Sequence, residues 1–425
     1  MPDSLPPGGA SVVVTALWLL YKAERPDYNE PPMSDTPDLE SKDISRSFAF
    51  FAFAAAAFLS GANLRLFDAL LPNVAKDFDV TPATAAIVIT AFTFAYGLFQ
   101  IVHGPLGDRI GKIRIAAVAT LCAAAASLGS ALAPTLHSLA LLRFVTGIGV
   151  SAVIPMALAW IGDKSSYEKR QLTLGRFVGF LLMGQVLGPA FGGILSEIFS
   201  WREVFYGLAA AFLVVGMALL IESCRPQSAT KARKGNVIRE YLQLFKDRWV
   251  RTVLVTIFLE GVLFFGSLAY VGAYLQHRFD LSIAVTGTLL AFYGIGGFLY
   301  SLSVRRLLLR MNEKQFVEVS GAILLICFVA LSWLPIWQLA MPVLVSLGFG
   351  LYMLHNTLQT KATEMAPGIR GTAIAVFAFS LFIGQAFGVT LTGFAISAVG
   401  YSWSFSVIGV SLLVLARWFA TRVMR

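Results

Sequence analysis

The sequence Gly-Gln-Val-Leu-Gly-Pro-Ala-Phe-Gly-Gly at residues 184–193 indicates an internal repeat, because its first five positions return 200 residues later as Gly-Gln-Ala-Phe-Gly at residues 384–388. A second echo lies nearer the start of each half, where Phe-Asp-Val-Thr at residues 78–81 matches Phe-Asp-Leu-Ser at residues 279–282. Both pairs run in the same direction at nearly the same offset. The chain therefore consists of two related halves in a parallel repeat.

The composition indicates that a lipid bilayer is the solvent for both halves. Hydrophobic residues make up 57% of the 425 residues and charged residues only 13%, with a mean hydropathy of +0.73, whereas ordinary globular domains carry about 25% charged residues. A soluble fold has too little interior to bury so much apolar surface. The three cysteines and four histidines are scattered, so neither a disulfide framework nor a metal site is expected, and no cofactor is implied.

Apolar runs of about 18–25 residues, the length that crosses a bilayer as a helix, alternate with short polar joints. We therefore expect an all-α membrane protein with twelve transmembrane helices in two pseudo-symmetric six-helix bundles. The predicted spans are 48–71, 83–104, 113–133, 136–162, 172–198, 204–221, 250–276, 283–307, 316–334, 336–359, 371–399 and 402–420. The predicted organisation is a flexible cytoplasmic tail over residues 1–45, a first bundle over 46–221, a basic cytoplasmic linker over 222–249 and a second bundle over 250–425.

The positions of Lys and Arg predict the orientation. Most of the 33 basic residues lie in the N-terminal tail, in the even-numbered joints, in the linker and at the C-terminus. Positive charge gathers on the cytoplasmic side of membrane proteins, so both termini are expected in the cytoplasm. This distribution also accounts for the net charge of +9 without nucleic acid as a partner.

The joint after the second span reads Gly-Pro-Leu-Gly-Asp-Arg-Ile-Gly-Lys-Ile-Arg at residues 104–114. Glycines permit a tight turn and a close helix approach, and an aspartate among basic residues could latch the bundle through an ion pair; the simpler interpretation is a positively charged loop. The order resembles motif A of the major facilitator superfamily. The resemblance implies a conformational gate made of Gly104, Asp108, Arg109, Gly111 and Lys112, with Asp163 at the end of the fourth span as a partner.

The stretch at residues 184–193 has glycines at helical spacing and one proline. The glycines Gly184, Gly188 and Gly192 leave one bare helix face and Pro189 favours a kink; the alternative is a close-packing face without further meaning. The full order, which ends in Gly193, is similar to motif C of the same superfamily, which marks proton-driven antiporters. The resemblance therefore implies antiport.

Four charged residues inside the apolar spans are candidates for function, because a charge in the membrane is costly unless it faces protein or water. Arg143 lies in a stretch similar to motif B, whose arginine is implicated in proton transfer; alternatively it snorkels to the interface. Arg65 and Asp68 share a helix face and can pair, as an outer-interface ion pair or as a site. The Asp-x-x-Leu-Pro pattern resembles the first span of the 12-span drug:proton antiporters, which implies a proton or cation role for Asp68.

Glu260 stands alone in an apolar run and is the candidate partner of Asp68 from the second half. A carboxylate in a low-dielectric cavity can exchange a proton near neutral pH, because burial disfavours the charged form. Glu260 could instead neutralise a neighbouring arginine. Other polar and aromatic side chains within the spans could line a cavity, or simply connect and pack helices, which is the more common role. These candidates are Gln100, Gln185, Tyr270, Tyr274, His355, Asn356 and Gln385.

The expected function is secondary active transport by a proton-coupled antiporter that exports small amphipathic or cationic, drug-like organic compounds by alternating access. Its partners would be protons, the solute and the lipid bilayer, and it would work as a monomer in a bacterial inner membrane. The proton gradient is the expected energy source, because the phosphate-binding pattern Gly-x-x-x-x-Gly-Lys-Ser/Thr is absent. The alternatives are a proton symporter or facilitator importing a metabolite and a non-transporting membrane receptor. An enzyme is not expected, because no nucleophile–base or metal constellation occurs.

Overall fold

The computed structural model describes residues 44–165, 167–225, 244–366 and 370–423, without the side chains of Arg46, Asp108, Tyr167, Glu168, Arg370 and Val423. Almost all of the predicted tail and most of the predicted linker lie outside these residues.

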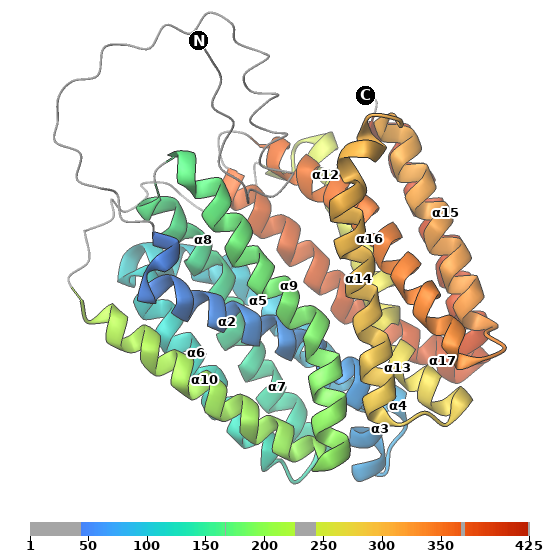
Figure 1. Ribbon diagram of the computed structural model, residues 1–425, viewed down its shortest axis with the longest axis horizontal. Coiled ribbons are helices and arrows are strands. Elements are labelled where there is room, and N and C mark those ends of the chain that lie inside the picture. Colours follow the sequence, from blue (N-terminus) through green and yellow to red (C-terminus); the bar gives the residue numbers. More distant parts are fainter. Residues whose placement is uncertain (1–43, 166, 226–243, 367–369, 424–425) are drawn as a thin grey trace, which may run out of the picture.

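The described chain is almost entirely helical (Figure 1). After the short η1 (Ile44–Arg46), the first half contains α2 (Phe48–Arg65), α3 (Phe67–Asp77), α4 (Pro82–Ala85), α5 (Ile87–Ile110), α6 (Lys112–Ala131), α7 (Leu136–Ser151), α8 (Val153–Lys164), α9 (Tyr167–Ile198) and α10 (Trp201–Ser223). The second half contains α12 (Arg248–Glu260), the π-helical η2 (Gly261–Phe265), α13 (Gly266–Phe279), α14 (Ile283–Leu308), α15 (Glu313–Ser332), η3 (Trp337–Leu339), α16 (Ala340–Glu364) and α17 (Arg370–Val423).

The predicted set of twelve spans is confirmed. Eleven helical stretches of described residues are long and apolar enough to cross a membrane. The last of them, Gly371–Arg422, holds two spans, because Gly400 has a non-helical backbone with φ 79° and ψ 172° where the two helices meet. The first span is longer than the sequence predicted, since α3 continues from α2 with a break only at Leu66.

The repeated Phe-Asp sequence forms the same turn in both halves. Asp79 and Asp280 adopt the left-handed backbone conformation, with φ of 52° and 51°, which short polar side chains tolerate better than most. Two residues later, the side-chain oxygens of Thr81 and Ser282 each accept a hydrogen bond from the backbone at the start of the next helix, as N-cap residues do. The repeated sequence therefore forms the same turn once in each half.

The glycine-rich stretches also make matching contacts, which relates the halves in three dimensions. A Cβ on Gly184 of α9 would overlap the carbonyl oxygen of Phe58 in α2, and a Cβ on Gly384 of α17 would overlap the carbonyl oxygen of Phe258 in α12. Both partners keep the offset of 200 residues. Small residues allow this close approach of helix backbones inside a membrane.

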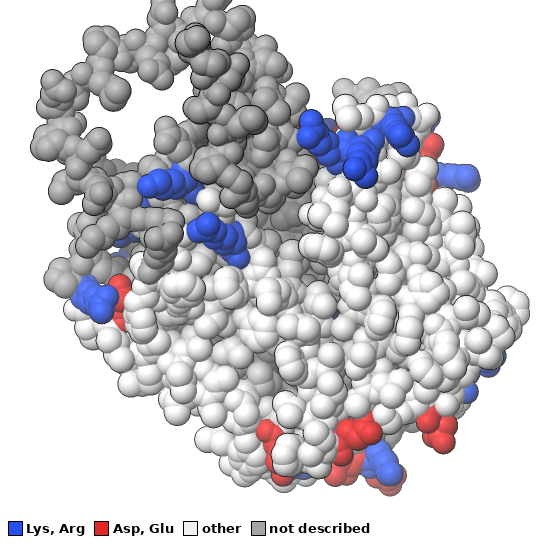
Figure 2. Space-filling view, in the orientation of Figure 1, with Lys and Arg blue, Asp and Glu red and all other residues white. Residues whose placement is uncertain are grey.

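The halves lie side by side and meet at the end opposite the start of α2 and the end of α17 (Figure 1). The contacting pairs include α3 with α13, α9 with α14 and α5 with α17. At that end, Gln276 Nε2 donates a hydrogen bond to the carbonyl oxygen of Ala69 over 3.0 Å. Toward the other end of α9, by contrast, a Cβ on Gly175 or Gly179 would have no described atom within 4 Å. In Figure 2, basic side chains gather at the end of the molecule where α17 ends, and the opposite end shows most of the visible acidic side chains together with some basic ones.

Candidate substrate and proton site

Arg65 and Asp68 form a buried ion pair at the break between α2 and α3. Arg65 Nη1 lies 3.6 Å from Asp68 Oδ2, and the two side chains are only 3% and 4% exposed. The second half covers the pair, because Gly272 of α13 packs directly on the carbonyl oxygen of Asp68. The pair therefore lies inside the protein, where the halves meet, rather than at an outer interface.

Arg143 of α7 is enclosed within the first half and does not snorkel. It is 1% exposed, and its guanidinium donates hydrogen bonds to the side-chain oxygen of Asn63 and, over 3.3 Å, to the Asn63 carbonyl oxygen. The guanidinium carbon also lies 4.1 Å from the ring centre of Phe92 and 4.8 Å from that of Phe67. Cation–π contacts of this kind stabilise a desolvated charge, so Asn63 and the rings hold Arg143 in place.

Glu260, the last residue of α12, pairs with a histidine of its own half. Its side chain is fully buried, and Oε2 lies 2.8 Å from Nδ1 of His355 in α16. The sequence had suggested Asp68 as its partner from across the halves, or a neighbouring arginine. The π-helical turn η2 begins directly after Glu260, and such turns occur often at functional sites.

Phe265 connects the two buried pairs. The guanidinium carbon of Arg65 lies 4.6 Å from the centre of the Phe265 ring, and this ring meets the His355 imidazole edge-on, with ring centres 6.2 Å apart. Arg65 and Phe265 are also equivalent positions of the repeat, 200 residues apart. Two equivalent residues that touch must lie near the pseudo-symmetry axis. These two residues, with Asp68, Glu260 and His355, form what we call the central cluster.

The predicted gate region is more regular than a loop. Helix α5 continues to Ile110 and α6 begins at Lys112, so that Gly111, with φ 109°, alone separates them. Lys112 forms an ion pair with Asp163 at the end of α8. Arg109 is exposed and a Cβ on Gly104 would have no described neighbour within 4 Å. The side chain of Asp108 lies outside the described part of the structure.

The predicted antiporter motif lies on α9 and contacts both halves. A Cβ on Gly188 would meet the backbone of Ala62 in α2, and one on Gly192 would meet the Leu66 side chain, as Gly184 does with Phe58. On another face of α9, Gly193 packs on Ile283 of α14, and the carbonyl oxygen of Pro189 packs on Gly287 of the same helix. This stretch of α9 is therefore held between the first span and the opposite half.

The other candidate cavity residues are spread over the molecule. Tyr270 donates a hydrogen bond to the Val389 carbonyl oxygen over 2.9 Å, and Tyr274 donates one to the Ser332 carbonyl oxygen over 3.3 Å. Both tyrosines are buried and connect helices within the second half, outside the central cluster. Among the polar candidates, Gln385 and Gln100 are buried, and Gln185 and Asn356 are half-buried.

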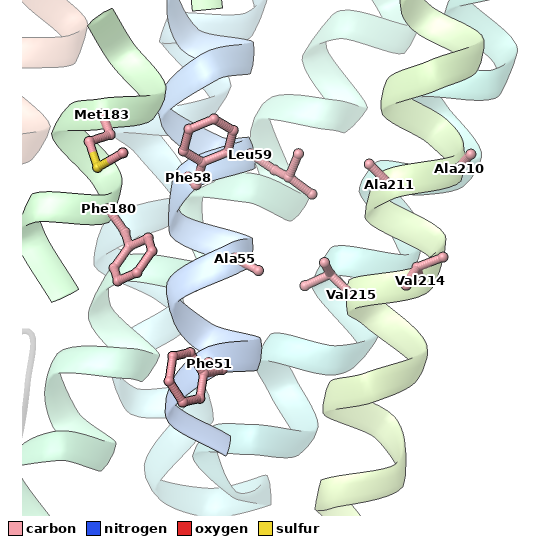
Figure 3. A pocket seen from close by; sticks show the side chains of 10 residues that line it. All are labelled: Phe51, Ala55, Phe58, Leu59, Phe180, Met183, Ala210, Ala211, Val214 and Val215. Atoms are coloured by element: carbon pink, nitrogen blue, oxygen red, sulfur yellow. The ribbon is translucent and has the colours of Figure 1, made fainter. Parts of the chain in front are cut away.

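An apolar groove of about 740 Å³ lies apart from the central cluster, between α2, α9 and α10 (Figure 3). Its lining residues include large exposed side chains, with Phe51 55%, Met183 52% and Val214 69% exposed. In a membrane-spanning chain such a surface faces lipid, so the groove is part of the protein–lipid boundary. The lining residues are Phe51, Ala55, Phe58, Leu59, Phe180, Met183, Ala210, Ala211, Val214 and Val215.

Two residues outside the predicted set, Asn63 and Glu197, also make contacts that connect helices. Asn63 fixes Arg143, and the only signal was a polar residue within an alanine-rich span. Glu197, at the end of α9, accepts a hydrogen bond over 2.8 Å from the backbone nitrogen of Ala284 in the other half. Nothing in the sequence distinguished Glu197 from other acids in the joints. Across the described residues, no group of His, Cys, Asp and Glu side chains is suited to a metal ion.

Comparison with known proteins agrees with this architecture. The sequence profile of the Major Facilitator Superfamily matches residues 53–380. The uncharacterized MFS-type transporter YceJ of Bacillus subtilis is 22% identical over 354 residues, which cover 83% of this chain and 89% of that protein. A bicyclomycin resistance protein homolog of Haemophilus influenzae is 25% identical over 323 residues, 72% of this chain and 79% of that protein.

Solved structures show the same fold. A bacterial homologue of the human lysosomal transporter Spinster, in an inward-facing conformation, superposes with a TM-score of 0.73 at 16% identity, over 89% of this chain and 97% of that one. Together with the twelve spans and the two matching halves, these similarities establish an integral membrane transporter rather than an enzyme. The chain belongs to the Major Facilitator Superfamily.

Proposed function

We propose that this transporter is a proton-coupled antiporter that exports small amphipathic or cationic organic compounds from the cytoplasm. The observation that carries the proposal is the buried Arg65–Asp68 ion pair at the meeting of the two halves. A carboxylate that titrates where the halves meet can link protonation to their relative movement. The bicyclomycin resistance protein homolog among the relatives is consistent with export of drug-like compounds.

The proposed coupling follows from the charge of Asp68. When Asp68 accepts a proton from the outside, it loses the negative charge that balances Arg65, so the cluster gains net positive charge and a cationic substrate is released. When Asp68 loses that proton to the cytoplasm, its charge returns and the carrier is reset. The stretch of α9 that resembles motif C supports antiport, because it is packed against both halves and would seal the pathway while they move.

The proposed orientation places both termini on the cytoplasmic side of a bacterial inner membrane, because most Lys and Arg lie in the tail, the even-numbered joints, the linker and the C-terminus. Residues 46–221 and 250–425 would then move as two units of a monomer, joined by the linker over residues 222–249. In this orientation the end where the halves meet is the outer end, and the described conformation is closed to the outside.

The test uses inside-out vesicles that contain the protein and a pH-sensitive dye, energised to acidify their interior. Cationic dyes, antibiotics and small metabolites are added in turn, and collapse of the pH gradient reports exchange of substrate for protons. We expect collapse with at least one compound and its loss in Asp68→Asn, which removes the titrating group at nearly constant size. Correctly folded protein that shows no proton movement with any compound contradicts antiport, and normal coupling by Asp68→Asn removes Asp68 from the mechanism.

A further inference from the structure

We propose that the central cluster binds flat solutes with opposite charges at their two ends, a cationic amine that contacts Glu260 and an acidic group that contacts Arg65, with the ring system against Phe265. The inference rests on the proposed function only in placing the substrate at this cluster. It restricts the cationic compounds of the proposed function to those that also carry an acidic group, the zwitterions.

The first observation is that Arg65 has unused hydrogen-bond donors. The residue is 2% exposed, yet Nε and Nη1 donate no hydrogen bond to any described residue. Asp68 balances its charge at 3.6 Å, a separation too long for a hydrogen bond. Buried polar atoms are nearly always hydrogen-bonded in folded proteins. A planar guanidinium with free N–H groups is a fitting partner for a carboxylate.

The second observation is that Glu260 has an unused acceptor. His355 takes Oε2, but Oε1, equally buried, has no hydrogen-bond partner within the described part of the chain. A carboxylate oxygen can only accept unless it is protonated, so its complement is an N–H donor, and a cationic amine makes the stronger bond. The free donors of Arg65 therefore suit an acidic group of a ligand, and the free acceptor of Glu260 suits an amine.

The third observation is that one aromatic ring contacts both Arg65 and the histidine that pairs with Glu260. Phe265 contacts Arg65 at 4.6 Å and the Glu260 partner His355 at 6.2 Å. Nearby, the rings of Tyr293 and Tyr352 are stacked at 6.2 Å. Flat ligands pack well against aromatic faces and edges. A flat ring system with one charged group toward Arg65 and the other toward Glu260 therefore suits this site.

The surrounding charges make the site selective. Asn63 and two phenylalanine rings hold Arg143 within the first half, so the ionisable side chains beside the ring are those of Arg65, Asp68, Glu260 and His355. A simple cation would be attracted to Glu260 but repelled by Arg65. A simple anion would be attracted to Arg65 but repelled by Glu260. Like charges brought together disfavour a wrong ligand more than a missing contact does. A zwitterion avoids both repulsions when its amine lies at Glu260 and its acidic group at Arg65.

The experiment measures equilibrium binding of norfloxacin, a fluorescent zwitterion with a flat ring system, to the full-length protein in detergent micelles. Its ethyl ester lacks the negative charge, and its N-acetyl derivative lacks the positive one. We expect the wild-type protein to bind the zwitterion at least about tenfold more tightly than either derivative, because each loses one charge-assisted hydrogen bond. Glu260→Gln should weaken the binding of the zwitterion and leave the affinity for the N-acetyl compound unchanged. Arg65→Gln should weaken the binding of the zwitterion and leave the affinity for the ester unchanged.

Glu203→Gln, at an exposed position of α10, is the matched control and should bind all three compounds like the wild type. Equal affinity of the wild type for the three compounds overturns the proposal, as does failure to bind norfloxacin at up to about 1 mM. This comparison needs only the wild-type protein, so it stands even where a variant fails to fold. Because no proton gradient is present, the binding result is independent of whether the transporter exchanges its substrate for protons.

Discussion

Arg143 is a cationic side chain buried within the first half, and no described carboxylate pairs with it. The side-chain and backbone oxygens of Asn63 and the faces of Phe67 and Phe92 replace the water that Arg143 loses. A buried charge without such partners is strongly unfavourable. Asn63 therefore holds the Arg143 guanidinium in position.

Asn63→Ala should therefore destabilise the protein, because it removes the side-chain acceptor and leaves a buried guanidinium N–H unpaired. A hydrogen bond to a charged group contributes about 1.5–3 kcal/mol, and we expect a loss of this order. Thermal unfolding in detergent, followed by tryptophan fluorescence, measures the effect. Asn63→Asp retains an acceptor and should lose less. If Asn63→Ala unfolds at the wild-type temperature, the aromatic rings and the backbone carbonyl oxygen of residue 63 are sufficient to stabilise Arg143.

Residue types within spans predicted the candidates at this scale but not their partners. Arg65 and Asp68 are three positions apart, so helical geometry was enough to predict their contact. Glu260 and His355 are 95 positions apart, and Arg143 and Asn63 are 80 apart, so no periodicity connects them. The aromatic positions of Tyr270 and Tyr274 suggested a cavity, whereas their hydroxyl groups satisfy helix carbonyl oxygens. Which side of a buried helix faces the centre depends on the packing of all its neighbours.

At the scale of the helices, α9 against α2 and α17 against α12 are one contact made twice. The sequence repeat predicted this equivalence, because both helices carry Gly-Gln-x-x-Gly. The region between α5 and α6 was less predictable. Its glycines and proline suggested a joint from residue 104 to residue 114, but α5 continues through Pro105 and only Gly111 is non-helical. In a membrane, neighbouring groups compensate for helix-breaking residues.

Gly184→Ala and Gly384→Ala should destabilise the protein to a similar extent. In each case the new methyl group would overlap the backbone of the facing helix, and overpacking of this kind costs about 1–3 kcal/mol. Gly179→Ala is the control, because the same change on α9 meets open space and should be neutral or slightly stabilising. Thermal unfolding of the three variants in one detergent provides the comparison. If Gly179→Ala destabilises the protein as much as Gly184→Ala and Gly384→Ala do, the loss of stability does not come from overlap with a facing helix.

At the scale of the whole molecule, the described conformation is held by contacts between the halves at one end. Glu197 is the charged member of this set, because its carboxylate accepts a hydrogen bond from the backbone nitrogen of Ala284 at the start of α14. A negative charge at a helix N-terminus is favourable. Gln276 adds a second polar connection, to the end of the first span. Alternating access requires such contacts to be strong enough to close this end and weak enough to open.

Glu197→Ala should therefore shift the population toward a conformation that is open at this end. Spin labels at Leu132→Cys and Ile336→Cys, exposed positions of the first and second half at this end, report the separation by double electron–electron resonance. The background lacks Cys122, Cys224 and Cys327, the free cysteines of the chain. We expect a longer distance to gain population in Glu197→Ala but not in Glu203→Ala, since Glu203 bonds to Ser200 within its own half. Unchanged distances in Glu197→Ala would mean that helix packing and the Gln276 hydrogen bond close this end without the carboxylate.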